Sequence, residues 1–298
     1  MRRPDRQREI TTVMTKSDTQ AILDALLDRC EVITTPCGDG HMTWRAWNAG
    51  RYDLPIVVLL HGGFGGWNHW VRNIPTLEKT HRVIAADLPG CGDSAEAPRP
   101  YTGASLAEIL STGLDIAIPG EEAFDLVSFS FGGIVSGLLA HAQARRIRSL
   151  TLVGSPVLGL TGTGPANDLV EVPRDLPLEE SAPLYRRNLQ NLMVHAPEAV
   201  DELAMTLHMA NMAKARLRSR GIARTSVLAD SLVDLPCRLN CIFGAGDVTL
   251  HPDLEGVRAY VEEIHPGVDF RVIPNAGHWV QYEAADAFNE VLPEVLDR

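Results

Sequence analysis

One serine in the middle of the chain has the neighbours that a nucleophile on a tight turn requires. Ser130 follows an apolar segment and precedes a helical pattern that opens with glycines. A nucleophile between a strand and a helix needs small residues two positions before and after it, because their backbones crowd the turn. Ser128 and Gly132 occupy those positions. Ser128 is itself the weaker candidate, because Leu126 stands two positions before it. We therefore predict Ser130 as the nucleophile.

A serine hydroxyl also needs a general base and a group that orients the base, and the C-terminal part of the chain contains both. Asp247 ends the segment Gly-Ala-Gly-Asp after one apolar run, and His278 ends Asn-Ala-Gly-His after the next. The chain order serine, then aspartate, then histidine is typical of a catalytic triad whose nucleophile lies on a strand-to-helix turn. His251 and His265 do not lie in a glycine turn directly after a strand. We predict a catalytic triad of Ser130, Asp247 and His278.

A glycine-rich loop can supply the donors that stabilise a negatively charged oxygen. The loop after Leu60 reads His-Gly-Gly-Phe-Gly-Gly-Trp, and its glycines let the backbone approach a substrate closely. We predict an oxyanion hole formed by the N–H groups of Gly63 and Phe131, the residue after the candidate nucleophile. The loop has neither the lysine of a phosphate-binding loop nor the spacing of a dinucleotide-binding loop, which argues against a nucleotide site.

The expected secondary structure places these residues at one edge of a parallel sheet. Short, almost continuously apolar segments alternate with helical patterns, as in a sheet that helices cover on both faces. The predicted strands are a hairpin at 31–35 and 42–48, followed by 56–60, 82–86, 124–129, 149–153, 239–243 and 270–273. The predicted helices are 105–116, 131–143, 253–263 and 280–296.

The alternation breaks between residues 156 and 234, where helical patterns at 184–193 and 201–218 replace strands. A helical insertion between two strands of one sheet is typical of a lid. We expect a loose N-terminal tail at 1–18, a core formed by 19–156 and 235–298, and a helical lid at 157–234.

Apolar side chains near the predicted triad favour a small apolar substrate. The pattern at 201–218 carries a row of methionines, which pack adaptably and can also line a pocket. The predicted substrate contacts are Phe64, Phe129, Trp279 and Met209.

Composition argues against several classes of partner. The 298 residues carry a formal net charge of −11, and such an acidic surface repels nucleic acids and anionic membranes. No apolar stretch is long enough for a membrane span, and the N-terminus lacks the apolar segment of a secretion signal. Five cysteines without a metal-binding pattern favour free thiols in a reducing compartment. We expect a cytoplasmic protein with no metal or organic cofactor, and a homodimer is compatible with the sequence.

These motifs together resemble the α/β-hydrolase family, from about residue 31 to residue 296. The resemblance rests on the glycine-rich loop, segment 87–94, the serine turn and the two C-terminal turns. It implies a mostly parallel eight-stranded sheet flanked by helices, with an inserted helical lid. Segments 66–73 and 277–283 are similar to those of the lidded meta-cleavage product hydrolases, which cleave carbon–carbon bonds in ring-fission products, and of related serine esterases.

Two positions depart from the meta-cleavage group. Phe129 stands before Ser130 where those enzymes commonly have a polar residue, and the lid helix offers Leu207 or His208 where they have an arginine. We therefore expect hydrolysis of a carboxylic ester, thioester or lactone through an acyl-enzyme. The alternatives are a carbon–carbon bond hydrolase acting on a ring-fission product, and a hydrolase-fold ligand receptor with little turnover.

Overall fold

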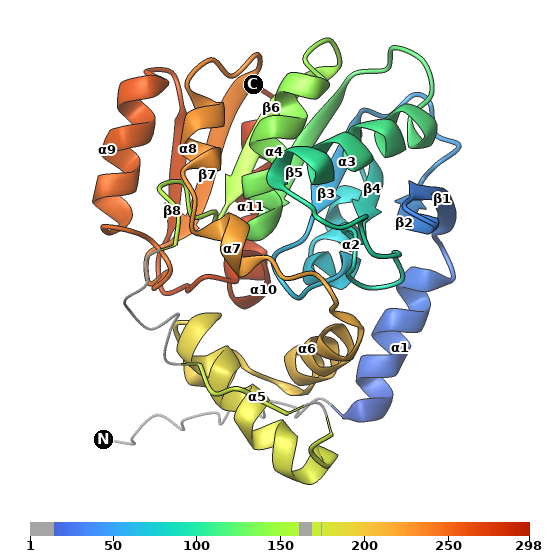
Figure 1. Ribbon diagram of the computed structural model, residues 1–298, viewed down its shortest axis with the longest axis vertical. Coiled ribbons are helices and arrows are strands. Elements are labelled where there is room, and N and C mark those ends of the chain that lie inside the picture. The colour runs from blue at the N-terminus through green and yellow to red at the C-terminus, as the bar shows by residue number, and fades with distance from the viewer. Residues whose placement is uncertain (1–14, 161–168, 174) are drawn as a thin grey trace, which may run out of the picture.

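The structure, a computed structural model, describes residues 15–160, 169–173 and 175–298, which contain one eight-stranded sheet (Figure 1). Its strands are β1 (Glu31–Cys37), β2 (Gly40–Trp47), β3 (Ile56–Leu60), β4 (Arg82–Ala86), β5 (Phe124–Phe129), β6 (Ile147–Val153), β7 (Arg238–Gly244) and β8 (Asp269–Ile273). They lie in the order β1-β2-β4-β3-β5-β6-β7-β8. The strand β2 is antiparallel to both of its neighbours, and β3 to β8 are parallel, which confirms the predicted fold class.

Helices cover both faces of this sheet. The helices of the described residues are α1 (Lys16–Leu27), α2 (Ile74–Leu77), α3 (Gly103–Ala117), α4 (Phe131–Ala142), α5 (Leu178–Leu192), α6 (Glu202–Lys214), α7 (Arg220–Ala223), α8 (Val227–Leu232), α9 (Leu254–Ile264), α10 (Val280–Glu283) and α11 (Ala285–Leu296), with short 3-10 turns at η1 (Trp67–Trp70) and η3 (Pro197–Ala199). None of them, within the described residues, is long and apolar enough to cross a bilayer.

Each face of the sheet has its own apolar core, because successive side chains of a strand point to opposite faces. On β5, Leu126 belongs to the cluster packed against α3 and α4, whereas Val127 and Phe129 belong to the cluster that includes α2 and α11. All residues of β3, β4 and β5 are buried, as their continuously apolar sequences predict. The central strands therefore form a rigid platform under their own carboxyl ends.

The segment between β6 and β7 contains α5, α6, α7 and α8. The helices α5 and α6 stand apart from the sheet, below it in Figure 1, and pack on each other, and α6 also packs on α1. We call α5 and α6 the cap helices. By contrast, α8 packs on α4, and its Leu228 and Leu232 join the core of the sheet.

Several helices differ from the sequence expectation, and for three of them the structure shows where the difference arises. Helix α1 was not predicted. It begins at Lys16, inside the expected tail, because Thr15 and Asp18 form a capping box; residues 1–14 of that tail lie outside the described residues. The helix expected at 201–218 ends at Lys214, since the next N–H groups donate to the carbonyl of Gly90. The C-terminal helix is interrupted at Ala284, where φ is −113° and ψ is 48°.

One carboxylate joins the cap helices to the loop after β8. Glu283 accepts hydrogen bonds from the N–H groups of His195 and Ala196, just after α5, at 2.9 and 2.7 Å. It also accepts the N–H of Gly277, in the loop after β8, at 2.6 Å. Hydrogen bonds to an ionised acceptor are stronger than neutral ones, so Glu283 holds the two segments together.

Close packing of α4 against α8 depends on Gly137. A Cβ atom there would lie 2.0 Å from Ser231 Oγ and 3.1 Å from Leu228 Cδ1. We expect Gly137→Ala to lower the free energy of unfolding by about 1–3 kcal/mol, because the helices must move apart. Urea unfolding followed by circular dichroism measures this. Gly50→Ala is the matched control, since a Cβ atom there meets nothing within 4 Å. Equal stability of the two variants would contradict this account.

Candidate active site

Ser130 occupies a strained turn between β5 and α4. Its φ is 51° and its ψ is −116°, a conformation that non-glycine residues rarely adopt. The turn is held because the N–H of Ser130 donates to the carbonyl of Val153 at 2.9 Å. The structure also explains why a small residue is required two positions later. A Cβ atom on Gly132 would lie 2.6 Å from the carbonyl oxygen of His61, which is too close for a side chain.

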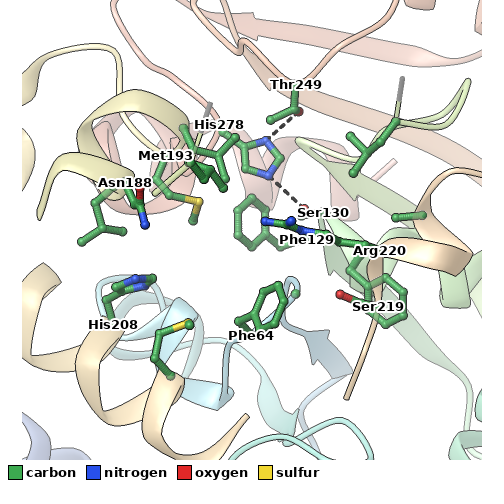
Figure 2. Close-up of a pocket in the computed structure, with 18 of the residues that line it drawn as sticks. Phe64, Phe129, Ser130, Asn188, Met193, His208, Ser219, Arg220, Thr249 and His278 are labelled. Carbon is green, nitrogen blue, oxygen red and sulfur yellow. Dashed lines mark hydrogen bonds between the residues drawn. The ribbon is translucent and has the colours of Figure 1, made fainter. Parts of the chain in front are cut away.

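The structure brings the three predicted triad residues into one hydrogen-bonded row, of which Figure 2 shows Ser130 and His278. His278 Nε2 lies 2.9 Å from Ser130 Oγ, and His278 Nδ1 lies 2.9 Å from Asp247 Oδ2. The side chain of Asp247 is fully buried and that of His278 is 5% exposed, so water competes little for these bonds. In this arrangement the serine hydroxyl donates to a ring nitrogen whose partner nitrogen faces a carboxylate.

Thr249, which was not predicted, completes the row. Its N–H and its hydroxyl both donate to Asp247 Oδ1, at 2.9 and 2.7 Å, and its hydroxyl lies 3.0 Å from His278 Nδ1. The carboxylate therefore has both oxygens engaged, one by Thr249 and one by the imidazole. The sequence signal was an aspartate followed two positions later by threonine, a pattern that favours a turn closed by the carboxylate.

The glycine-rich loop after β3 is held by His61. The ring contacts the carbonyl of Gly62 through Nδ1 at 2.7 Å and accepts the N–H of Leu88 through Nε2 at 2.9 Å, which makes Nδ1 the protonated nitrogen. The C=O and N–H of a trans peptide point in opposite directions. Fixing the Gly62 carbonyl toward His61 therefore turns the Gly63 N–H away from it.

Gly63 and Phe131 both line the cavity beside Ser130, as predicted for the oxyanion hole. Within the described residues, neither N–H donates to a protein acceptor. The Phe131 N–H lies at the first position of α4, where a helix has no internal partner for it. Two unengaged N–H groups next to a serine hydroxyl form a site suited to a developing negative charge.

A buried ion pair supports the same loop from below. Asp87, just after β4, accepts the N–H of Trp67 at 2.8 Å and the N–H of Asp93 at 3.0 Å, and it pairs with Arg45 at 2.8 Å. The Asp87 and Arg45 side chains are 1% and 8% exposed. The resemblance covered segment 87–94, but nothing in the sequence indicated that Arg45, from the hairpin, would be its partner.

A cavity of about 580 Å³ lies between the row of three residues and the cap helices (Figure 2). Phe64 and Phe129, two of the predicted substrate contacts, line it. Its wall is otherwise largely apolar, with Leu160, Leu189, Leu192, Met193 and Met212 among the contributing side chains. Its volume and lining suit a small molecule with an apolar portion.

Two predicted substrate contacts do not line this cavity. Trp279 is buried behind it, stacked on Tyr282 at 4.1 Å, with its indole N–H donating to the carbonyl of His69. Met209 faces an outer groove between α1, α5 and α6, and Met212 on the same helix faces the cavity instead. The sequence did not decide between these faces of α6, because both carry methionine.

Two histidines, His69 and His208, add polar groups to the apolar wall. His69 lies under Phe129 and Trp279, with ring centroids 5.5 and 5.0 Å away, and its Nδ1 has no partner among the described residues. Burial lowers the pKa of His69 well below its usual range and that of His208 to about 4. Both imidazoles are therefore uncharged at neutral pH.

The low pKa of His208 makes the stability of the protein depend on pH. In the unfolded chain a histidine titrates near pH 6.5. Between about pH 6.5 and 4 the unfolded state binds a proton that the folded state does not, so the free energy of unfolding falls as the pH falls, by at most about 1.4 kcal/mol per pH unit from this group. We expect His208→Phe to flatten that slope in urea titrations.

Met212→Leu is the control for this experiment. It alters the same wall of the cavity without removing a titratable group, so it should keep the wild-type slope. An unchanged slope in His208→Phe would show that His208 is protonated in the folded state at these pH values.

Comparison with known proteins agrees with this fold. A family model described as the alpha/beta hydrolase family matches residues 57–291. The dihydrolipoyllysine-residue acetyltransferase component of an acetoin cleaving system from Pseudomonas putida is 31% identical over 78% of this chain. The chain spans only 61% of the length of that relative.

A hydrolase of 2-hydroxy-6-oxononadienedioate and 2-hydroxy-6-oxononatrienedioate from Paraburkholderia phymatum is 28% identical over 80% of this chain and 86% of its own length. Among solved structures, the carboxylesterase CesB from Bacillus subtilis superposes with a TM-score of 0.74 at 18% identity, covering 93% of this chain and 95% of its own. That likeness concerns the fold alone. Since the family model spans most of the sequence, this chain belongs to the α/β hydrolase family.

Proposed function

We propose that this protein is a serine hydrolase that cleaves a carboxylic ester, thioester or lactone of a small, largely apolar substrate. The observation that carries the proposal is the row Ser130 Oγ, His278 Nε2, His278 Nδ1 and Asp247 Oδ2, with 2.9 Å at each of its two hydrogen bonds. Such a row activates a hydroxyl that is otherwise a weak nucleophile.

The proposed reaction begins when Ser130 Oγ attacks the acyl carbonyl carbon and His278 Nε2 takes the hydroxyl proton. Asp247 holds the Nδ1–H tautomer and stabilises the imidazolium that forms. The N–H groups of Gly63 and Phe131 bind the oxyanion. The tetrahedral intermediate collapses, the leaving group receives the proton from His278, and an acyl-enzyme remains. Water, deprotonated by His278, then releases the acid and restores the serine.

The cap helices supply the proposed substrate specificity, as the sequence led us to expect of a lid. Leu189 and Leu192 of α5 and Met212 of α6 close the cavity opposite Ser130. An apolar wall of this kind binds hydrocarbon chains or rings by burying their surface and imposes little directional preference.

Cleavage of a carbon–carbon bond is the second candidate, because one relative is named as a hydrolase of 2-hydroxy-6-oxononadienedioate. Two features favour ester cleavage over it. Phe129, directly before the serine, offers no hydrogen bond to such a polar, charged substrate. Of the two residues where the sequence register would place an arginine, Leu207 is buried in the core, and His208 lines the cavity but is uncharged at neutral pH because burial lowers its pKa.

Hydrolysis of p-nitrophenyl esters from acetate to decanoate tests the proposal. We expect wild type to release nitrophenol with an optimum at intermediate chain length, and Ser130→Ala to lose the activity by at least about a thousandfold. Ser128→Ala is the matched control. Ser128 is two positions away and fully buried, and its hydroxyl has no partner among the described residues, so this variant should keep its activity.

Loss of activity in Ser128→Ala with retention in Ser130→Ala would show that Ser128, and not Ser130, is the nucleophile. If folded wild type cleaves a ring-fission dienoate faster than any ester, the second candidate replaces the first.

Thr249→Val tests how the acid is held. Valine keeps the shape but removes the hydroxyl that donates to Asp247 Oδ1, a bond to a charged group. We expect kcat to fall by about 10- to 100-fold while KM changes little, because the loss affects the transition state in which His278 becomes charged. Thr249→Ser retains the donor and should recover most of the rate. Equal rates for the serine and valine variants would exclude this role for the hydroxyl.

A further inference from the structure

The cavity has a second polar wall, opposite Ser130, that the proposed reaction does not use. His208 projects into the cavity from α6, and Figure 2 shows it across the open space from Ser130 and His278. Met212, one turn further along the same helix, also lines the cavity. Phe64, from the glycine-rich loop, lies between the two walls in Figure 2.

Both ring nitrogens of His208 lack a protein partner in the part of the chain that the structure describes. The ring packs edge to face against Tyr185 of α5, with ring centroids 5.4 Å apart. A neutral imidazole has one donor and one acceptor, and both remain available to a molecule in the cavity, because His208 is only half-buried. A leucine or phenylalanine at this position would offer no such directional group.

The neighbouring polar side chain makes no hydrogen bond to His208 and bonds to the backbone instead. Asn188 also lines the cavity. Its side-chain amide donates to the carbonyl of Val170 and accepts the N–H of Val170, each at 2.8 Å. Asn188 is thereby occupied in holding the segment at 169–173 against α5. His208 is left as a directional group pointing into the cavity.

The charge of the wall restricts what this group can bind. Burial holds the imidazole of His208 neutral, so it offers a hydrogen bond without a positive charge. The charged side chains that line the cavity, among the described residues, are Arg220 and Glu171, and both are exposed to solvent. Figure 2 places Arg220 on the Ser130 side. An anionic group on the substrate therefore finds no cation at the wall of His208.

We infer that His208 forms a second subsite, which binds an uncharged hydrogen-bonding group of the substrate, a ketone or hydroxyl, across an apolar stretch from the carbonyl that Ser130 attacks. This assignment rests on the proposed hydrolase function, and it narrows the substrate to an acyl compound with two polar groups separated by hydrocarbon. A substrate lacking the second group would occupy the cavity without this hydrogen bond, so the site discriminates against it.

The test uses p-nitrophenyl esters of straight-chain acids of increasing length, each paired with the same ester bearing a ketone at its penultimate carbon. We expect wild type to favour the ketone by about tenfold in kcat/KM at one chain length. His208→Phe keeps an aromatic ring beside Tyr185 and should bring that ratio close to one, because kcat/KM falls more for the ketone ester than for the plain ester. His208→Gln, which offers a neutral donor and acceptor, should recover part of the preference.

His41→Phe is the matched control, since this histidine is exposed on the hairpin of β1 and β2, and it should keep the wild-type ratio. An equal ratio in wild type and His208→Phe overturns the inference while leaving ester hydrolysis intact. A preference for an ester ending in a carboxylate, lost in His208→Phe, overturns it as well, because the subsite would then bind an anion.

A binding measurement separates failure of the inference from failure of the proposed function. Calorimetric titration of Ser130→Ala with each ester pair needs no turnover. Tighter binding of the ketone member, abolished by adding His208→Phe, supports the subsite even if wild type cleaves none of the esters. Equal binding of both members overturns the subsite in either case.

Discussion

The conformation of one residue determines how the rest of the site is built. Ser130 adopts a φ of 51° between a buried strand and a buried helix, which costs about 1–3 kcal/mol for a residue with a side chain. The cost is tolerated because β5 and α4 are fixed on both sides, and because glycines at 132 and 133 let α4 approach the loops after β3 and β6. His61 fixes the oxyanion loop against the same turn, so the hydroxyl and the donors around it share one support.

Much of this arrangement follows from sequence because it depends on local rules. A parallel sheet brings its carboxyl ends to one edge, so Ser130, Asp247 and His278 could be assigned to the same site from their positions after apolar segments. The pairing of Arg45 with Asp87 could not, since it joins segments far apart in the sequence. The bonds of Thr249 to Asp247 are local, but the contact of Thr249 with His278 joins two separate loops. The sequence also did not show which face of α6 lines the cavity. Met209 faces α1 and α5, whereas Met212 faces the cavity.

The cavity combines two kinds of specificity. In the proposed hydrolase, the apolar wall binds hydrocarbon of many shapes by burying its surface. His208 and the oxyanion donors bind polar atoms through hydrogen bonds, which depend on direction. Separating the directional groups across the space makes the distance between two polar atoms of a ligand a selection criterion. Phe129 is an apolar residue beside the serine, at the position where the sequence comparison with the meta-cleavage group led us to expect a polar one. The polar side chain His208 lies on the opposite wall instead.

Glu283 gives the cap a thermodynamic link to the proposed base. Its carboxylate bonds to the N–H groups after α5 and to that of Gly277, the residue directly before His278. Moving α5 outward must break bonds that also hold the histidine loop, so an open cap and a well-placed imidazole disfavour each other. By reciprocity, any molecule that holds the cap open from its outer face would weaken the histidine without entering the cavity. Remote inhibition is thus a property of this connection and needs no separate regulatory domain.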